Sequence, residues 1–224
     1  MLVEIQCDKF KTGGKDGEVR PPIRFHAGLN AVVGDDDRSN SIGKSTLLMI
    51  IDYAFGGDDY IKKCSDIHSA IKEHVINFTF RFGDVEYSFA RNTADYMYVI
   101  PCDRAYKPLQ DQQKMHIDDF RQFLSDMYKV DAEGLTWRGL MSKFIRVFRR
   151  DTMDAERPLQ QSRDEPVRTS VINYLKQFKR YTPVKEKIDQ AQSAEDEKKA
   201  FKLSVDRGHI RMAQTDKEYR ENEA

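Results

Sequence analysis

The tetrapeptide Gly43-Lys44-Ser45-Thr46 constrains the fold of this 224-residue chain more than any other feature. It follows an apolar run at residues 29–33, which predicts a short strand. It precedes residues 47–55, whose apolar positions recur at three- and four-residue steps and predict a helix that ends at Gly56 and Gly57. A turn between a strand and a helix can wrap a phosphate with backbone N–H groups at the positive end of the helix. The sequence therefore predicts a phosphate-binding loop.

This loop is longer than the usual pattern, in which a Gly and four residues precede Gly-Lys-Ser/Thr. Arg38 occupies the position of the first Gly, and the nearest upstream glycine is Gly34, four residues earlier. We expect residues 35–38 to bulge outward while residues 39–45 form the phosphate cup. The three consecutive aspartates of the bulge must then face away from the phosphates or meet a magnesium ion. A decayed or coincidental loop is the alternative.

ATP and Mg²⁺ are the predicted ligands of the loop. The Lys44 ammonium is placed to reach the β- and γ-phosphates, and the Ser45 hydroxyl is placed to hold Mg²⁺. The predicted nucleotide-binding residues are Gly34, Ser39, Asn40, Ser41, Ile42, Gly43, Lys44, Ser45 and Thr46.

The chain carries no second motif for hydrolysis. Residues 47–52 have the composition of a Walker B strand ending in Asp52, but they lie on the helix predicted after the loop and cannot also form a strand. No Leu-Ser-Gly-Gly-like segment is present, and residues 140–151 contain no Gln. The catalytic residues therefore stay unassigned, and the chain alone is expected to hydrolyse ATP poorly.

Strand patterns flank the predicted loop and helix. Residues 2–7 predict a first strand, and two alternating runs around Gly83-Asp84, at residues 76–89, predict a hairpin. Residues 96–100 predict a further strand ended by Pro101. Apolar positions at helical spacing then predict helices at residues 117–128 and 136–148.

Charged residues dominate beyond Pro183, and the few apolar positions form no sustained heptad. A solvated helix or the root of a coiled coil is favoured there over disorder. We expect a globular domain at residues 1–166 and a helical tail at residues 167–224.

Composition excludes several other classes of protein. Lys+Arg and Asp+Glu are both 37, so net charge gives no sign of a polyanionic partner. Cys7, Cys64 and Cys102 share no metal-type spacing and are expected to be free thiols. Residues 1–10 lack the basic and then apolar layout of a signal peptide, and no apolar run approaches the roughly 20 residues that span a bilayer. No membrane partner and a cytoplasmic location are expected.

These motifs together resemble the N-terminal half-head of SMC-like ABC ATPases, the group that includes SbcC-, RecN- and RecF-type proteins. The resemblance rests on a first strand ending in Lys9-Phe10-Lys11, the segment "FHAGLNAVVG", the Gly-Lys-Ser-Thr loop and the Phe-rich hairpin ending in Arg91. The spelling "SNSIGKSTLL" is most similar to bacterial SMC-like ATPases, some of them linked to phage defence. The resemblance covers residues 1–150.

The resemblance implies an α/β P-loop NTPase fold of the ABC half-head type. It implies a β-hairpin lobe, a helical subdomain and a protruding C-terminal helix that starts a coiled coil. It also implies a C-terminal half-head that supplies the signature and Walker B motifs, and a second head that closes over ATP in a homodimer. The implied activity is ATP-dependent head engagement on DNA in repair, maintenance or phage defence, and a nuclease is a candidate partner. The chain is then a fragment, or one half of a split ATPase.

Positive charge concentrates in one region. Residues 141–185 contain eleven Lys/Arg and five Asp/Glu. Arg146, Arg149 and Arg150 are the predicted contacts to DNA phosphates. A solvated helix face, or ion pairs with the C-terminal half, is the alternative.

Single residues carry weaker hypotheses. Arg91 is interpreted either as a basic residue near the nucleotide or lobe interface, or as a solvent-facing strand terminus. Lys9 and Lys11 either flank an adenine or are surface lysines, and Trp137 is expected in the core.

Two other functions stay open. A stand-alone P-loop kinase or NTPase would need a second acid and an Arg-rich lid, and the Phe-rich hairpin argues against it. The other is an interaction module gated by nucleotide that never hydrolyses it.

Overall fold

The computed structural model describes residues 1–12, 17–32, 43–130, 134–145, 156–157, 160 and 164–210. The chain divides into two compact units, Met1–Gln177 and Phe178–Ala224. Helix α6 (Val167–Gln177) belongs to the first unit. The predicted division after residue 166 stays a prediction.

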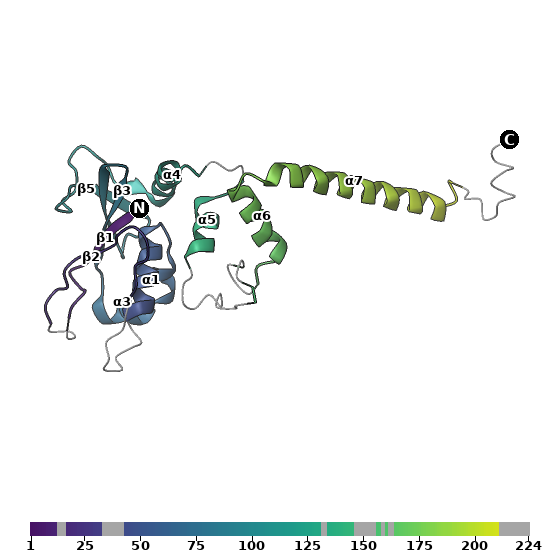
Figure 1. The fold of residues 1–224 in the computed structure, drawn as a ribbon. Coiled ribbons are helices and arrows are strands. Elements are labelled where there is room, and N and C mark those ends of the chain that lie inside the picture. Colours follow the sequence, from purple (N-terminus) through teal and green to yellow (C-terminus); the bar gives the residue numbers. More distant parts are fainter. Residues whose placement is uncertain are drawn as a thin grey trace, which may run out of the picture. The chain divides into compact units, whose positions relative to one another are not determined.

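The first unit is built on a six-stranded sheet in the order β2-β1-β3-β4-β5-β6, and its described neighbours pair antiparallel (Figure 1). The strands are β1 (Leu2–Gln6), β2 (Ile23–Arg24), β3 (Val75–Phe82), β4 (Val85–Asn92), β5 (Tyr98–Cys102) and β6 (Met115–His116).

The predicted hairpin is confirmed. Phe82 pairs with Val85 across the Gly83-Asp84 turn, and Gly83 has the positive φ of +60° that a tight hairpin turn requires. Side chains on a strand alternate between its faces, so Phe78 and Phe80 of β3 point the same way, and both are fully buried.

The strand predicted at residues 29–33 is wrong for residues 29–32, which belong to no strand. A turn held by a side chain lies there instead. Asn30 accepts a hydrogen bond from the His26 amide at 3.0 Å and donates to the His26 carbonyl at 2.8 Å. The strand next to β1 is β2, through the pairs Glu4↔Arg24 and Ile5↔Ile23. Val33 lies outside the described residues.

Strand β5 also differs from expectation, because it continues through Pro101 to Cys102. Pro101 pairs with Phe89 of β4, whereas β6 pairs only with Tyr98 and Val99. Proline lacks an N–H and is tolerated where no neighbouring strand needs that donor. The proline therefore lies within the strand and does not end it.

The described helices of the first unit are α1 (Gly43–Ala54), α2 (Asp59–Lys63), α3 (Ser65–Ile71), α4 (Ile117–Met127), α5 (Trp137–Phe144) and α6. The helices predicted after the loop and at residues 117–128 are confirmed as α1 and α4. The helix predicted at residues 136–148 is confirmed from Trp137 to Phe144, and Ile145 already has an extended backbone. Thr136 caps α5 by accepting from the Gly139 amide at 3.1 Å. The short helices α2 and α3 were not predicted from the apolar pattern.

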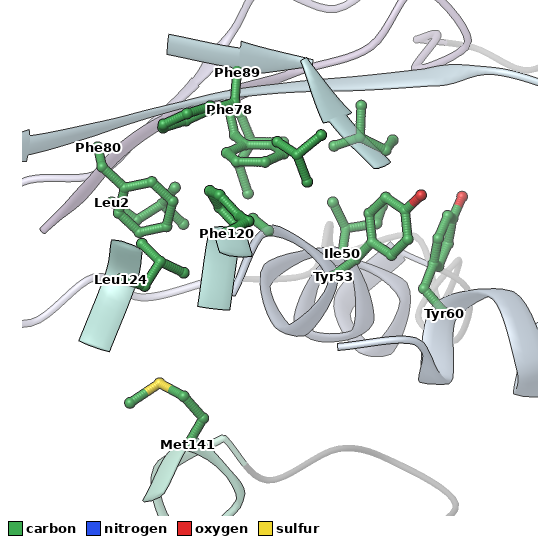
Figure 2. Close-up of a cluster of buried hydrophobic side chains, with 14 of the residues drawn as sticks. Leu2, Ile50, Tyr53, Tyr60, Phe78, Phe80, Phe89, Phe120, Leu124 and Met141 are labelled. Carbon is green, nitrogen blue, oxygen red and sulfur yellow. The ribbon is translucent and has the colours of Figure 1, made fainter. Parts of the chain in front are cut away.

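The core lies between one face of the sheet and the helices α1 and α4 (Figure 2). The Phe78 ring lies 5.9 Å from the Phe120 ring of α4, and the Phe80 ring lies 5.1 Å from the Phe55 ring just after α1. Tyr53 of α1 is fully buried in the same cluster. Each fully buried side chain of this size contributes about 1.5–3 kcal/mol. This packing fixes α1 against the sheet.

The second unit contains α7 (Tyr181–Asp206), a helix of 26 residues with no buried residue among those described. A helix that is polar on all sides gains little from packing within its own chain. The predicted helical tail is confirmed from Tyr181 to Asp206, and the coiled coil stays a prediction.

Two further expectations concern cysteines and membranes. Cys7, Cys64 and Cys102 are buried and form no disulfide, as predicted, and burial raises the pKa of the Cys7 thiol to about 11. Within the described part of the chain, no helix combines the length and the apolar character needed to cross a bilayer.

Candidate nucleotide-binding site

The structure places Gly43, Lys44, Ser45 and Thr46 in the first turn of α1. This turn contains no acidic residue. A Cβ added to Gly43 would meet no atom of the described residues within 4 Å, and the next three residues are half-buried. The first N–H groups of a helix lack intrahelical partners and carry partial positive charge. Together with the Lys44 ammonium, this end of α1 suits a polyanion.

Other predicted site residues lie outside the described residues. They are Gly34, Ser39, Asn40, Ser41 and Ile42 of the loop, and Arg146, Arg149 and Arg150 of the basic region. Their roles stay predictions, as does the outward bulge of residues 35–38.

The opposite end of α1 terminates as predicted at the two glycines. Gly56 adopts a φ of +82°, and its amide donates to the Tyr53 carbonyl at 3.1 Å. The Gly57 amide donates to the Asp52 carbonyl at 2.8 Å. A glycine in the left-handed region is the usual end of a helix because it has no Cβ to clash.

Arg91 of β4 holds this C-terminal end. Its guanidinium donates to the carbonyls of Tyr53 at 2.7 Å and Gly57 at 2.8 Å, and its Nε donates to the Tyr96 carbonyl at 2.8 Å. It also lies 3.9 Å from the centre of the Tyr53 ring. The side chain is fully buried, and burial lowers its pKa to about 10.

The interpretation of Arg91 as a solvent-facing strand terminus is therefore wrong. The carbonyls at the end of a helix carry partial negative charge and attract a buried cation. Arg91 also does not lie beside the predicted phosphates. The 12 residues of α1 separate it from Gly43 by about 17 Å of helix.

Two more side chains cap the same end from the helical segments. Arg121 of α4 donates to the Gly56 carbonyl from Nε at 3.0 Å and from Nη2 at 2.8 Å. Trp137 of α5 donates from Nε1 to the Phe55 carbonyl at 3.0 Å, and its ring stacks on Phe55. Trp137 is buried, which confirms its predicted place in the core.

Asp52 lies on α1, as expected, and not on a Walker B strand. Its carboxylate is buried and accepts from Arg138 Nη2 of α5 at 2.7 Å. Gly57 leaves room for this carboxylate, because a Cβ at position 57 would lie 1.8 Å from Asp52 Oδ2. A buried acid needs a cation nearby, so the position of Asp52 on the apolar face of α1 could have predicted a basic side chain beside it. Nothing in the spacing pointed to Arg138 or Arg121.

Lys9 lines a cavity of about 370 Å³ together with Asp8, Glu73, His74, Val75, Asn77 and Asn92. Lys11 is exposed. The placement of an adenine beside these lysines stays a hypothesis.

Within the basic region, Lys143 is bound inside the protein. Lys143 of α5 is buried, and its Nζ lies 2.6 Å from Glu165 Oε1 and 3.4 Å from Ser170 Oγ of α6. Lys143 is thus not on a surface that could meet DNA. Gln160 is buried beside this pair and donates to the Glu165 carbonyl.

A family model described as an AAA domain matches residues 15–224. The chain belongs to the AAA domain family. This AAA domain occurs in SMC-like and SbcC-type ATPases, and it supports ATP binding by a P-loop. No curated protein and no solved structure matches the chain. The fold is that of an α/β AAA-type P-loop domain, and the residues in the first turn of α1 suit the nucleotide and Mg²⁺ that the family suggests.

Proposed function

We propose that the chain binds Mg·ATP at the N-terminal end of α1 and is the ATP-binding part of an SMC-like ATPase that acts on DNA. The observation that carries this proposal is the asymmetry of α1. Its first turn combines Gly43-Lys44-Ser45-Thr46 with no carboxylate, whereas two arginines and a tryptophan donate to carbonyls in and just after its last turn.

The asymmetry favours an anion at one end only. Cations at the C-terminal end offset the negative pole of the helix, and each such contact is worth about 0.3–2 kcal/mol. The positive pole has no acidic residue in its own turn. Lys44 then binds the β- and γ-phosphates, and the Ser45 hydroxyl binds Mg²⁺. A bound Mg²⁺ would offset part of the negative charge of the triphosphate.

Calorimetric titration with Mg·ATP tests this step. Wild type is expected to bind, and its melting temperature should rise, with a stabilisation of about 2.7 kcal/mol at 100 times Kd. Lys44→Ala should lose binding and should still fold without ligand, which circular dichroism checks. Lys107→Ala, which removes an exposed lysine from the loop after β5, is the matched control and should bind as wild type does. A folded wild-type chain with no affinity for Mg·ATP overturns the proposal.

We also propose that a C-terminal half-head carrying the signature and Walker B motifs completes the enzyme. Three apolar residues flanking the loop in sequence support this, because Leu29, Val32 and Leu48 are 87%, 47% and 42% exposed. Exposed apolar residues mark a protein interface where they form a contiguous patch, and we propose that these three contribute to such a patch. In the completed enzyme a second head closes over ATP, and hydrolysis releases it.

Coexpression with such a half, encoded in frame or by a neighbouring gene, tests the second step. The pair should copurify and hydrolyse ATP, and the 224-residue chain alone should not. Leu29→Asp should weaken the pair, whereas Val85→Asp at the hairpin turn, where the valine is also exposed, should not. Full ATPase activity without any second half counts against the proposal and favours a stand-alone NTPase.

DNA binding is the third step, and it rests on the basic region at residues 141–185. Fluorescence anisotropy with duplex DNA should show affinity that falls steeply with salt. Arg149→Ala and Arg150→Ala should each reduce the salt slope by about 1. Arg104→Ala removes an arginine that is 83% exposed in the first unit, and should leave the slope unchanged. Binding that is absent or insensitive to salt in the whole assembly removes DNA from the proposal.

A further inference from the structure

The ion pair between Asp52 of α1 and Arg138 of α5 contains one hydrogen bond where two could form. Arg138 Nη2 donates to Asp52 Oδ1 at 2.7 Å. The other two atoms that could pair, Arg138 Nη1 and Asp52 Oδ2, are both buried and have no hydrogen-bond partner among the described residues. A guanidinium and a carboxylate can form two parallel hydrogen bonds, which is their strongest arrangement. The same two side chains can therefore form a second, better-paired contact.

The residues around this ion pair favour two discrete positions of the Asp52 and Arg138 side chains over a continuous range of positions. Asp52 Oδ2 occupies space that exists only because Gly57 has no Cβ. Trp137, next to Arg138, is bonded to the Phe55 carbonyl and stacked on the Phe55 ring. A buried polar atom without a partner is unfavourable, so a contact with both hydrogen bonds would be more stable than the observed contact with one. Tightly packed elements that differ in this way shift between two arrangements.

We propose that Arg138 is a positioning residue that couples α5 to the nucleotide site, and that Mg·ATP favours the arrangement in which both Arg138–Asp52 hydrogen bonds are closed. This inference rests on the proposed binding of Mg·ATP at the first turn of α1. Helix α1 is one continuous element that carries Lys44 near its start and Asp52 near its end. A ligand that fixes the start of α1 also fixes where the Asp52 carboxylate meets α5. Arg138 does not touch the ligand.

The coupling is reciprocal, so weakening the pair must weaken ligand binding. Arg138→Lys keeps the charge but cannot form two parallel hydrogen bonds, and Asp52→Asn keeps the shape but removes one acceptor. Each should weaken Mg·ATP affinity about tenfold, within the range usual for coupled sites. Lys44→Ala, in contrast, should abolish binding. Arg104→Lys changes an exposed arginine in the same way and should leave affinity unchanged.

Amide hydrogen exchange distinguishes coupling from a purely structural role of Arg138, because only coupling makes the protection of α5 depend on Mg·ATP. Mg·ATP should slow exchange at residues 140–144 of α5 in wild type and in Arg104→Lys, but not in Arg138→Lys or Asp52→Asn. All titrations are made well below the melting temperature of each variant, and circular dichroism checks that each variant is folded. If Asp52→Asn does not fold, Arg138→Lys alone decides the result.

The outcomes separate the two proposals. Wild-type affinity together with ligand-dependent protection of α5 in Arg138→Lys overturns the coupling and leaves Mg·ATP binding intact. Protection confined to residues 43–50 in wild type also overturns the coupling. A wild-type chain that does not bind Mg·ATP at all overturns the proposed function, and the coupling with it.

Discussion

At its C-terminal end, α1 is held by side chains from β4, α4 and α5, whereas at its N-terminal end it presents its own Gly-Lys-Ser-Thr turn without an acidic residue. The first end is built from buried contacts between segments far apart in the sequence. The second is built from four consecutive residues. Both contain a glycine, and the two glycines differ in what surrounds them. A Cβ at Gly57 would clash with Asp52, whereas a Cβ at Gly43 would meet no atom of the described residues within 4 Å.

This difference assigns separate roles to the two ends. Substitutions of Arg91, Arg121 and Trp137 at the C-terminal end should mainly change folding, because they leave buried carbonyls without partners. Substitutions at the N-terminal end should mainly change ligand binding, because the first turn carries the residues predicted to bind the phosphates and Mg²⁺. Four predictions follow the comparison from the largest expected effect to the smallest.

Arg91→Met should lower the free energy of unfolding by about 4 kcal/mol, since three buried carbonyls lose a charged donor at once. Equilibrium unfolding in urea measures this loss of stability. Arg81→Met on β3 is the control, because Arg81 pairs with Glu86 at the exposed edge of the same hairpin and should contribute about 0.5 kcal/mol. Equal losses for the two variants would contradict the role given to Arg91.

Gly57→Ala should cost about 3 kcal/mol, because the added Cβ would lie 1.8 Å from Asp52 Oδ2 and 2.8 Å from the Asp52 carbonyl. Gly43→Ala is the matched variant at the other end of α1. It should keep or raise stability by about 0.5–1 kcal/mol, the usual gain of alanine over glycine in a helix. It should nevertheless weaken Mg·ATP binding where the ligand approaches the backbone. Thermal unfolding and titration of both variants separate these effects.

At both ends of α1 the sequence predicted what consecutive residues determine. The helix after the loop and its end at Gly56 and Gly57 are confirmed, whereas the binding roles of Lys44 and Ser45 stay predictions. The contacts of Arg91, Arg121 and Arg138 depend on how β4, α4 and α5 pack. The spacing of residues along the chain does not predict that packing. Arg91 shows the limit, because a charged residue at the end of an alternating strand has the pattern of a surface residue.

Strand predictions show a similar limit. The hairpin around Gly83 was predicted well because turn and alternation lie within one short segment. Residues 29–33 have the apolar composition of a strand, but a strand also needs a neighbour, and Asn30 closes a turn there instead. Pro101 was predicted to end β5, yet β6 does not extend far enough to need its missing donor.

Trp137→Phe should cost about 1 kcal/mol, because it keeps the stacking on Phe55 and removes only the hydrogen bond to the Phe55 carbonyl. Tyr128→Phe is a useful control. The Tyr128 ring lies 5.3 Å from the Trp137 ring, and no hydrogen bond of its hydroxyl is seen among the described residues. Denaturant midpoints should therefore fall for Trp137→Phe and stay unchanged for Tyr128→Phe.

Ser45→Glu sharpens the comparison at the N-terminal end, where the smallest change in stability is expected. A carboxylate in the first turn of a helix interacts favourably with the positive pole, so the variant should gain about 0.5 kcal/mol without ligand. The same carboxylate repels the triphosphate and removes the hydroxyl predicted to bind Mg²⁺, so Mg·ATP should no longer raise the melting temperature. Ser45→Gln, which is similar in size and neutral, should show the loss of binding without the gain in stability. A Ser45→Glu variant less stable than Ser45→Gln would mean that the N-terminal end of α1 is not an open positive pole, and the contrast between its two ends would fail.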